Sequence, residues 1–180
     1  MKFIPFILFF GLPVFSAQYI EPLRNIRFDY DEATWEIKDA ATKPQGEEVD
    51  KNMAQKTIVN LQRKISDERY HSRFSLVLDD ASKIKKTAPT LFESYQKHAV
   101  EFMKSQRFDV ISTKEVKLPK IKEPAFEIRA NQRDFGLLFR QIVFLKGDTA
   151  YLLTAATRTL KYEAYEKEID KMFNSFELTK

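Results

Sequence analysis

The sequence predicts a single α+β domain, an α/β/α sandwich in which a mostly antiparallel sheet is covered by helices on both faces. Three observations support this class. The 180 residues leave room for one ordinary domain. Strand-like and helix-like segments follow one another without the alternating order of a parallel βαβ sheet. Residues 137–145 and 150–156 are apolar on both sides, and such strands have to be covered on both sides.

The N-terminus predicts an exported protein. After the basic residue Lys2, residues 3–20 carry no charge and are dense in Phe, Ile and Leu. A short positive start, an apolar run and small residues near Ser16-Ala17 are typical of a secretory signal peptide. The alternatives are an uncleaved membrane anchor, since the run is close to the about 20 apolar residues of a membrane span, and a cytoplasmic chain.

These features divide the chain into two parts. We expect a signal peptide over residues 1–17, cleaved near residues 16–18, and one domain over residues 18–180. The exact bond stays open, because cleavage after Ala17 places the bulky Phe15 three residues upstream.

The composition excludes several kinds of chemistry. The chain has no cysteine, which excludes disulfides, thiolate metal sites and a nucleophilic thiol. With four glycines it also lacks a Gly-rich phosphate loop. Loss of Lys2 with the signal peptide leaves 29 basic and 26 acidic residues, a net charge of +3. A balance this even gives no reason to expect a nucleic acid as partner.

Alternation of apolar and polar residues predicts six strands besides the central pair. They are residues 25–30, 35–37, 57–63, 73–78, 110–118 and 125–130. We expect the first two to form a hairpin around a tight turn, and the last two to be exposed. Residues 42–53 are polar and predict a loop, and residues 79–88 predict a charged, exposed connection.

The central pair of strands, 137–145 and 150–156, is joined by Gly147-Asp148, which suits a tight hairpin turn. We expect these two strands at the centre of the sheet, because side chains on both of their faces are apolar.

Two helices are expected. Thr90 and Glu93 have the spacing of a capping box before a helix over residues 91–106. Its buried stripe is predicted to be Leu91, Phe92, Tyr95, Ala99, Phe102 and Met103. The second helix is predicted over residues 160–173, with Asn174 as a left-handed C-cap and Phe176 packing back onto the helix end. Its buried stripe is predicted to be Tyr162, Tyr165, Ile169, Met172 and Phe173.

The mature chain resembles the PsbP-like family, including the DcrB-like periplasmic proteins. The resemblance is carried by Phe28-Asp29-Tyr30 followed by Trp35, by the hairpin from Arg140 to Ala155, and by Met172-Phe173-Asn174-Ser175-Phe176. It covers residues 26–178. It implies an α/β/α sandwich and a non-enzymatic role in binding proteins or assisting complex assembly, with no family-wide catalytic residue to carry over.

Histidine and serine give no catalytic pattern. His71 precedes a predicted strand and His98 lies in the first helix, and the sequence has no His-x-x-x-His motif or Glu-neighboured His pair. We therefore expect neither to be catalytic. No serine lies in a nucleophile motif; the nearest candidates are Ser72, Ser75, Ser82 and Ser105.

Two charge clusters have a functional and a structural interpretation. Asp29, Asp31, Glu32 and Glu36 could form a calcium or carboxylate-pair site, but their spacing is not that of an EF-hand, and we favour a solvated turn. The lysines could contact anionic lipid or an acidic partner, but we favour a solubilising loop and a protected strand edge. These lysines are Lys83, Lys85, Lys86, Lys114, Lys117, Lys120 and Lys122.

We therefore expect an exported, non-catalytic binding or assembly factor of the cell envelope, periplasmic or secreted. It needs no cofactor or metal, and we name no catalytic or binding residue for it. Its expected partner is an envelope protein, with membrane contact only through an uncleaved signal peptide. The alternative is a periplasmic module that binds a small molecule or lipid in a groove between sheet and helix. Trp35, the single tryptophan, is expected in the core or as a partly exposed cap of the sheet.

Overall fold

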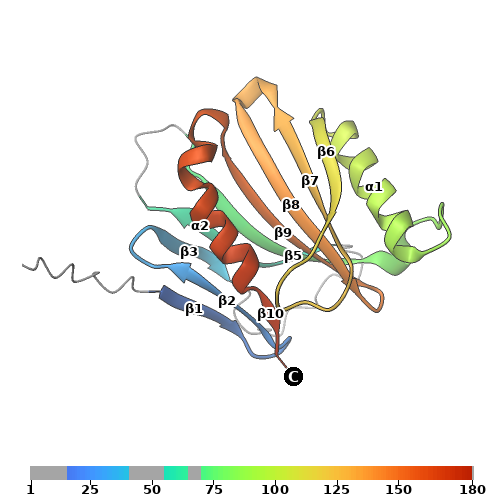
Figure 1. Ribbon diagram of the computed structural model, residues 1–180, viewed down its shortest axis with the longest axis horizontal. Helices are drawn as coiled ribbons and strands as arrows, with labels where there is room; N and C mark the ends of the chain where they lie inside the picture. The colour runs from blue at the N-terminus through green and yellow to red at the C-terminus, as the bar shows by residue number, and fades with distance from the viewer. Residues whose placement is uncertain (1–15, 41–54, 65–69, 180) are drawn as a thin grey trace, which may run out of the picture.

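The computed structural model describes residues 16–40, 55–64 and 70–179 (Figure 1). The strands are β1 (Ser16–Glu21), β2 (Ile26–Asp31), β3 (Trp35–Ala40), β4 (Gln55–Arg63), β5 (Arg73–Asp80), β6 (Asp109–Val116), β7 (Ala125–Gln132), β8 (Leu137–Lys146), β9 (Thr149–Arg158) and β10 (Glu177–Leu178). The helices are α1 (Leu91–Ser105) and α2 (Tyr162–Ser175), with short 3₁₀ turns η1 (Ala81–Lys83), η2 (Arg133–Phe135) and η3 (Thr159–Lys161).

Within these residues the strands form two antiparallel sheets. The large sheet has seven strands in the order β3-β4-β5-β9-β8-β7-β6, and the small sheet has the order β1-β2-β10. The hairpin of β8 and β9 lies at the centre of the large sheet, as the sequence predicts. Gly147 at its turn has a φ of +59°, a backbone conformation that glycine adopts without the steric cost of a Cβ atom.

Alternate residues of β8 and β9 belong to two apolar clusters. Ile142 and Leu153 pack in a large cluster with α2 and the small sheet, whereas Val143 and Leu152 pack in a smaller cluster with α1. In Figure 1, α2 crosses in front of the strands, while α1 lies beside β6 and β7. Both sides of the central hairpin are therefore buried.

The predicted fold class is confirmed at the level of a mixed α/β domain with a large antiparallel sheet and two helices. The full sandwich, with helices over both faces, stays a prediction. Apolar packing under α1 does not extend across the sheet, because the same side carries the polar residues Asn60, Ser75 and Thr154 where β4, β5 and β9 pair.

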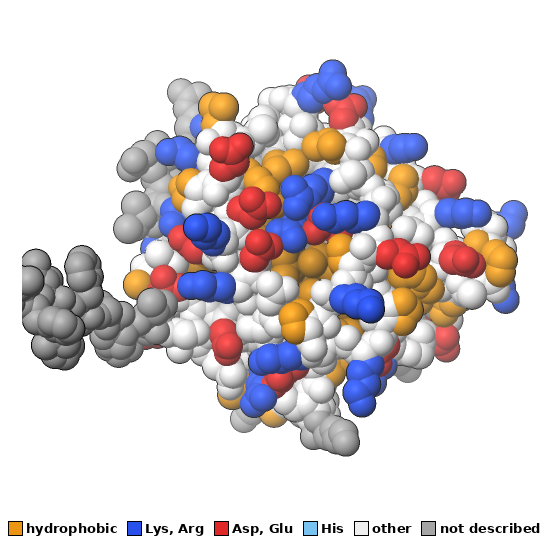
Figure 2. Space-filling view, viewed as in Figure 1, with side chains coloured by type: hydrophobic (Ala, Val, Ile, Leu, Met, Phe, Trp, Pro, Cys, Tyr) orange, Lys and Arg blue, Asp and Glu red, His pale blue; other side chains and the backbone are white. Residues whose placement is uncertain are grey.

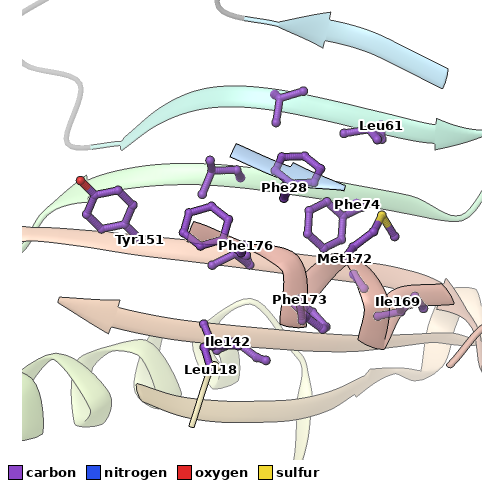
Figure 3. Packing of buried hydrophobic residues seen from close by; sticks show 14 of the residues in the cluster. Phe28, Leu61, Phe74, Leu118, Ile142, Tyr151, Ile169, Met172, Phe173 and Phe176 are labelled. Carbon is purple, nitrogen blue, oxygen red and sulfur yellow. The ribbon is translucent and has the colours of Figure 1, made fainter. Parts of the chain in front are cut away.

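Phe28 joins the small sheet to the large cluster (Figure 3). Its ring centroid lies 5.2 Å from that of Tyr19, 5.4 Å from Phe74 and 6.4 Å from Phe176. Phe176 is fully buried and packs back at the end of α2, as predicted. These aromatic side chains come from both sheets and from the segment after α2, so the cluster fixes the two sheets against each other.

Several predicted details are wrong. The turn after β2 does not close a hairpin: β2 pairs with β1 and β10 in the small sheet, whereas β3 pairs with β4 in the large one. β7 is buried rather than exposed, because β6 and β8 flank it and side chains pack on both of its sides.

Both helices also differ from prediction at particular residues. The capping box of α1 is confirmed, but Phe102 is 48% exposed and Ser94 is buried instead. α2 begins at Tyr162, leaving Leu160 exposed, and continues through Asn174 to Ser175. The predicted left-handed cap is therefore absent from α2, and within the described residues the non-glycine positions with positive φ are Asn25 and Arg107.

The remaining predictions concern connections. In the 79–88 segment Asp79 and Ala81 are buried, because β5 continues to Asp80. The loop over 42–53 and residues 1–15 of the predicted signal peptide lie outside the described residues. Ser16 and Ala17, at the expected cleavage position, pair with β2 as the start of β1. None of the helices in the described ranges has the length and apolar character to cross a membrane.

Candidate functional site

A groove of about 100 Å³ lies between α1 and the large sheet. One water molecule needs about 10–15 Å³ of such space, and pockets that enclose a drug-sized ligand start at about 300 Å³. The groove is therefore sized for a single side chain or a short alkyl chain. It is lined by Gln55, Val77, Asp79, Tyr95, His98, Ala99, Phe102, Met103, Gln141 and Leu152.

Tyr95 and Asp79 form the polar part of the groove. The Tyr95 hydroxyl donates a hydrogen bond of 2.6 Å to Oδ2 of Asp79, and the two residues are 2% and 7% exposed. Burial raises the pKa of the Tyr95 phenol far above its ordinary value, and the hydrogen bond to Asp79 and the charge of Asp79 raise it further. Tyr95 therefore stays a neutral donor throughout the physiological range.

The start of α1 fixes Tyr95 in place. The Glu93 backbone N–H donates to Oγ1 of Thr90, and the Thr90 N–H donates to the Glu93 carboxylate, which completes the capping box. One residue later, the buried Ser94 hydroxyl accepts hydrogen bonds from the backbone N–H groups of Thr87 and Ala88. The first turn of α1 is thus held at both its cap and the preceding loop, and Tyr95 follows directly.

Gln141, His98 and Phe102 surround this pair. Gln141 donates from Nε2 to Oγ1 of Thr154 at 2.9 Å, so its carbonyl oxygen is the group available to a ligand. The His98 ring meets the Tyr95 ring edge to face, with centroids 6.2 Å apart. Phe102, on α1, lines the groove and is half exposed.

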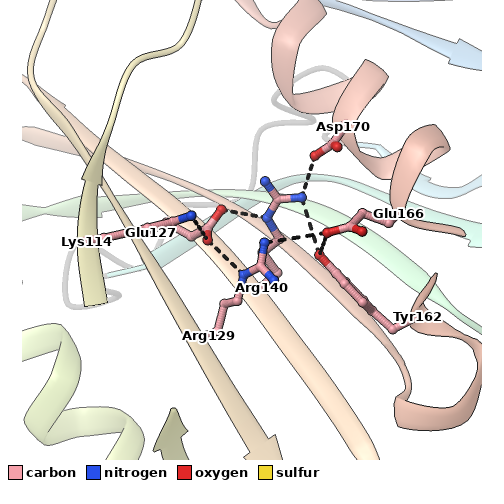
Figure 4. A network of polar contacts seen from close by, with 7 residues as sticks. All are labelled: Lys114, Glu127, Arg129, Arg140, Tyr162, Glu166 and Asp170. Carbon is pink, nitrogen blue, oxygen red and sulfur yellow. Dashed lines mark hydrogen bonds and ion pairs between the residues drawn. The ribbon is translucent and has the colours of Figure 1, made fainter. Parts of the chain in front are cut away.

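A network of charges lies on the α2 side of the large sheet (Figure 4). The Glu127 side chain is 1% exposed and accepts hydrogen bonds from Nε of Arg140 at 2.6 Å and from Nε of Arg129 at 2.8 Å. Lys114 approaches the same carboxylate at 3.4 Å. Arg140 also donates to Asp170 of α2. The network therefore ties α2 to β7 and β8.

The aromatic hydroxyl of Tyr162 extends this network. It accepts from Arg140 Nη1 at 3.4 Å and donates to Glu166 at 3.1 Å. Glu166 also lies 3.6 Å from Arg129. In the space-filling view of Figure 2, Lys and Arg side chains lie interspersed with Asp and Glu side chains near the centre of the face.

The electrostatics of the network favour its charged form. Burial alone would raise the pKa of Glu127, but hydrogen bonds from Arg140 and Arg129 outweigh it and hold the pKa below the ordinary value. Burial would lower the pKa of Arg140, but hydrogen bonds to Asp170 and Glu127 raise it instead. A carboxylate held ionised between cations is poorly suited to act as a general acid or base near neutral pH, so we interpret the network as structural.

The two histidines lie in different environments. His98 lines the groove, whereas Nδ1 of His71 lies 3.3 Å from the backbone oxygen of Arg63 at the end of β4. Among the serine candidates, the Ser82 hydroxyl donates to Asp80 at 2.6 Å and the Ser105 hydroxyl donates to the backbone oxygen of Phe102 at 2.7 Å. The backbone oxygen of the buried Ser72 accepts from the Arg63 N–H.

The acidic cluster of the first turn does not converge. Asp29 accepts from Gln18, Asp31 accepts from the backbone of Ala33, and Glu36 pairs with Lys38. Across residues 16–40, 55–64 and 70–179, His, Asp and Glu form no group of three that could hold a metal ion.

Three lysines of the two basic runs are in ion pairs. Lys83 pairs with Asp80, Lys114 with Glu127, and Lys120 with Glu177. Trp35 lies in the core, 1% exposed, and its Nε1 donates to Glu168 of α2 at 3.2 Å.

The sequence points to His98 of the groove and Lys114 of the network, but it does not predict the pairs Tyr95–Asp79 and Glu127–Arg140. Tyr95 was placed in the buried stripe of the first helix, and its phenol was a signal that a polar partner faces it. Glu127 was a second signal, because it interrupts the apolar residues of strand 125–130. The partner of each, Asp79 or Arg140, comes from another strand, and its identity is not visible in local spacing.

The chain is similar to known proteins in its three-dimensional structure and not in its sequence. No protein-family model matches it, and no curated protein matches its sequence. The solution structure of cyanobacterial PsbP (CyanoP) from Synechocystis is similar with a TM-score of 0.60 and 11% identity, covering 92% of this chain and 94% of that one. A protein of unknown function from Pseudomonas aeruginosa gives a TM-score of 0.47 and 13% identity, covering 89% of this chain and 94% of that one.

At this level of identity, the similarity to CyanoP shows the fold alone. The chain therefore has a PsbP-like fold. The DcrB-like part of the resemblance stays a prediction.

Proposed function

We propose that the protein is an exported, non-catalytic binding or assembly factor of the cell envelope, and that it holds a segment of a partner protein in the groove between α1 and the large sheet. The groove is the observation that carries this proposal. It is sized for one side chain, with Val77 and Leu152 on its sheet side and the half-exposed Phe102 on its helix side. A small pocket of this kind suits an anchoring side chain at the centre of a protein interface.

Three further observations support the proposal. The uncharged run after Lys2 supports export to the periplasm or outside the cell. The fold similarity to CyanoP supports a PsbP-like accessory role. The contacts of the two helices with alternate residues of β8 and β9 support the α/β/α arrangement as part of the same proposal.

Site-specific crosslinking in the native cells tests the partner. A photo-reactive phenylalanine analogue replaces Phe102 at the groove, and in a matched control it replaces Leu160, which is 91% exposed and lies in η3 before α2. We expect a discrete protein adduct from position 102 and none from position 160. Equal adducts from both positions, or none from position 102, contradict docking at the groove.

A second candidate is a binding module for a small molecule or lipid. The apolar walls of the groove around a buried carboxylate favour it. Native mass spectrometry of gently purified protein distinguishes the two candidates. A small bound mass that disappears when Leu152 is replaced by Trp to fill the groove supports this candidate, and an unliganded mass together with an adduct from position 102 supports the first.

A further inference from the structure

We propose that the groove under α1 binds an alkylammonium group, such as a lysine side chain, with Asp79 as its counter-ion. This inference rests on the proposed function, because it names the chemistry of the group that the partner inserts. Three features support it: the buried carboxylate, the absence of Lys and Arg from the described residues that line the groove, and the apolar walls.

The carboxylate of Asp79 has little compensation for its burial. A buried ionised carboxylate is costly unless it is hydrogen-bonded and paired with a cation. Among the described residues, the hydrogen bond to its side chain comes from the neutral Tyr95 phenol, and none of the ion pairs there includes Asp79. A ligand cation would therefore supply the positive charge that none of the described residues gives to Asp79.

The lining of the groove selects the sign of the ligand charge. The chain has 30 Lys and Arg residues, yet none lies among the described residues that line the groove. Glu127, in contrast, contacts Arg129, Arg140 and Lys114. Within the described ranges, cations of the chain itself therefore neutralise Glu127 on the α2 side of the sheet, whereas Asp79 is in no ion pair and can accept one from a ligand.

The walls of the groove select the shape of the ligand. Val77, Leu152 and Met103 offer apolar surface to a methylene chain. The carbonyl oxygen of Gln141 is a second acceptor for an ammonium group, which carries three donors and no acceptor. A lysine side chain combines a four-carbon apolar stem with this head group, so it matches both parts of the groove. His98 also lines the groove, where its ring packs edge to face on the Tyr95 ring.

NMR titration tests the chemistry of the ligand. The probes are n-butylammonium, n-butanol and butyrate, which share the alkyl chain and differ in the head group. We expect n-butylammonium to bind in the millimolar range and to shift the amide signals of residues 77–79, 95–103 and 152. We expect n-butanol to bind at least 10-fold more weakly and butyrate not to bind. Equal binding of n-butylammonium and n-butanol overturns the proposal.

Two variants identify the counter-ion. Asp79→Asn removes the charge but keeps an acceptor for the Tyr95 hydroxyl, and we expect at least 10-fold weaker binding of n-butylammonium with the melting temperature nearly unchanged. Tyr95→Phe removes the hydrogen bond but keeps the charge, and we expect binding within about 3-fold of the wild type or tighter. Unchanged binding by a folded Asp79→Asn variant overturns the proposal, and so does loss of binding in Tyr95→Phe alone.

A blocked Gly-Lys-Gly peptide distinguishes the source of the ammonium group. Binding at least as tight as that of n-butylammonium supports a lysine of a partner protein. Binding of n-butylammonium without binding of the peptide overturns the protein source and assigns the site to a free amine. If the crosslink from position 102 persists in the Asp79→Asn background, the proposed docking function stands while the ammonium assignment is overturned.

Discussion

Glu127 of β7 and Arg140 of β8 are joined diagonally across two neighbouring strands, with Oε2 of Glu127 2.6 Å from Nε of Arg140. They are not register partners: Glu127 lies opposite Ile142, and Arg140 lies opposite Arg129. Because Arg140 also donates to Asp170 of α2, one guanidinium connects two strands and a helix. A single substitution should therefore weaken both the strand pair and the helix contact.

Replacing Glu127 by Gln should destabilise the fold by about 3 kcal/mol, because it leaves two buried or half-buried guanidinium groups without their anion. Urea unfolding followed by the fluorescence of Trp35 measures this change. The matched control is Lys114→Gln, which removes an ion-pair partner whose side chain is 56% exposed, and should cost less than about 1 kcal/mol. Equal effects of the two variants contradict a dominant role for the buried arginines.

The contribution of Glu127 should depend on pH. Because its pKa in the folded state lies below that in the unfolded state, the stabilisation is complete above the unfolded value of about 4.5 and is lost as the pH falls through the folded pKa. The difference in unfolding free energy between wild type and Glu127→Gln should be constant from pH 6 to 7 and should shrink below about pH 4.5. Urea titrations at each pH test this, and a difference that grows on acidification contradicts the assigned direction.

Replacing Phe28 by Ala should cost about 3–5 kcal/mol, because it opens a cavity between Tyr19, Phe74 and Phe176. Ile20→Ala on the neighbouring strand removes a side chain that is 60% exposed and should cost less than about 1 kcal/mol. Thermal unfolding of both variants measures the contrast. A small effect at Phe28 would show that the small sheet contributes little to the stability of the domain.

Replacing Gly147 by Ala should destabilise the protein by about 1 kcal/mol through the backbone alone, since its φ is +59° and a Cβ atom there meets nothing within 4 Å. Gly147→Asn should cost less, because Asn tolerates the left-handed region better. Chemical denaturation of the two variants separates backbone conformation from crowding. If Asn costs as much as Ala, the conformational explanation is wrong.

The parts of the fold that the sequence predicts are those with a strong local signal. The central hairpin is one, since its strands are apolar on both sides around Gly147-Asp148. The capping box of Thr90 and Glu93 is another, because both of its bonds lie within one turn. These signals depend on residues a few positions apart, which a linear sequence displays directly.

The errors come from long-range pairing. The sequence predicts a hairpin turn at 31–34, although one partner of β2, the strand β10, lies 150 residues later in the chain. β1 begins at the predicted cleavage position of the signal peptide, and β10 has two residues, so neither gives a local strand signal. β7 is predicted to be exposed, because local spacing does not show that Arg140, which lies opposite Arg129, pairs diagonally with Glu127.

The candidate site divides in the same way. Tyr95 was placed correctly in the buried stripe of the first helix, because helical spacing marks that stripe. Its hydrogen bond to Asp79 of β5 depends on how α1 packs against the large sheet, and this orientation follows from tertiary packing. The alternative in which a ligand lies between sheet and helix stays a prediction, and the size of the groove and the place of Asp79 in its lining are visible only in three dimensions.

The pairing of β2 with β10 sets an order of events during synthesis. The backbone of Asn25, at the start of β2, accepts hydrogen bonds from Thr179, which is 154 positions away. At about 5–20 residues per second, a ribosome takes roughly 8–30 s to add that many residues. During that interval Phe28 lacks its neighbour Phe176, so part of the aromatic cluster stays exposed on the nascent chain.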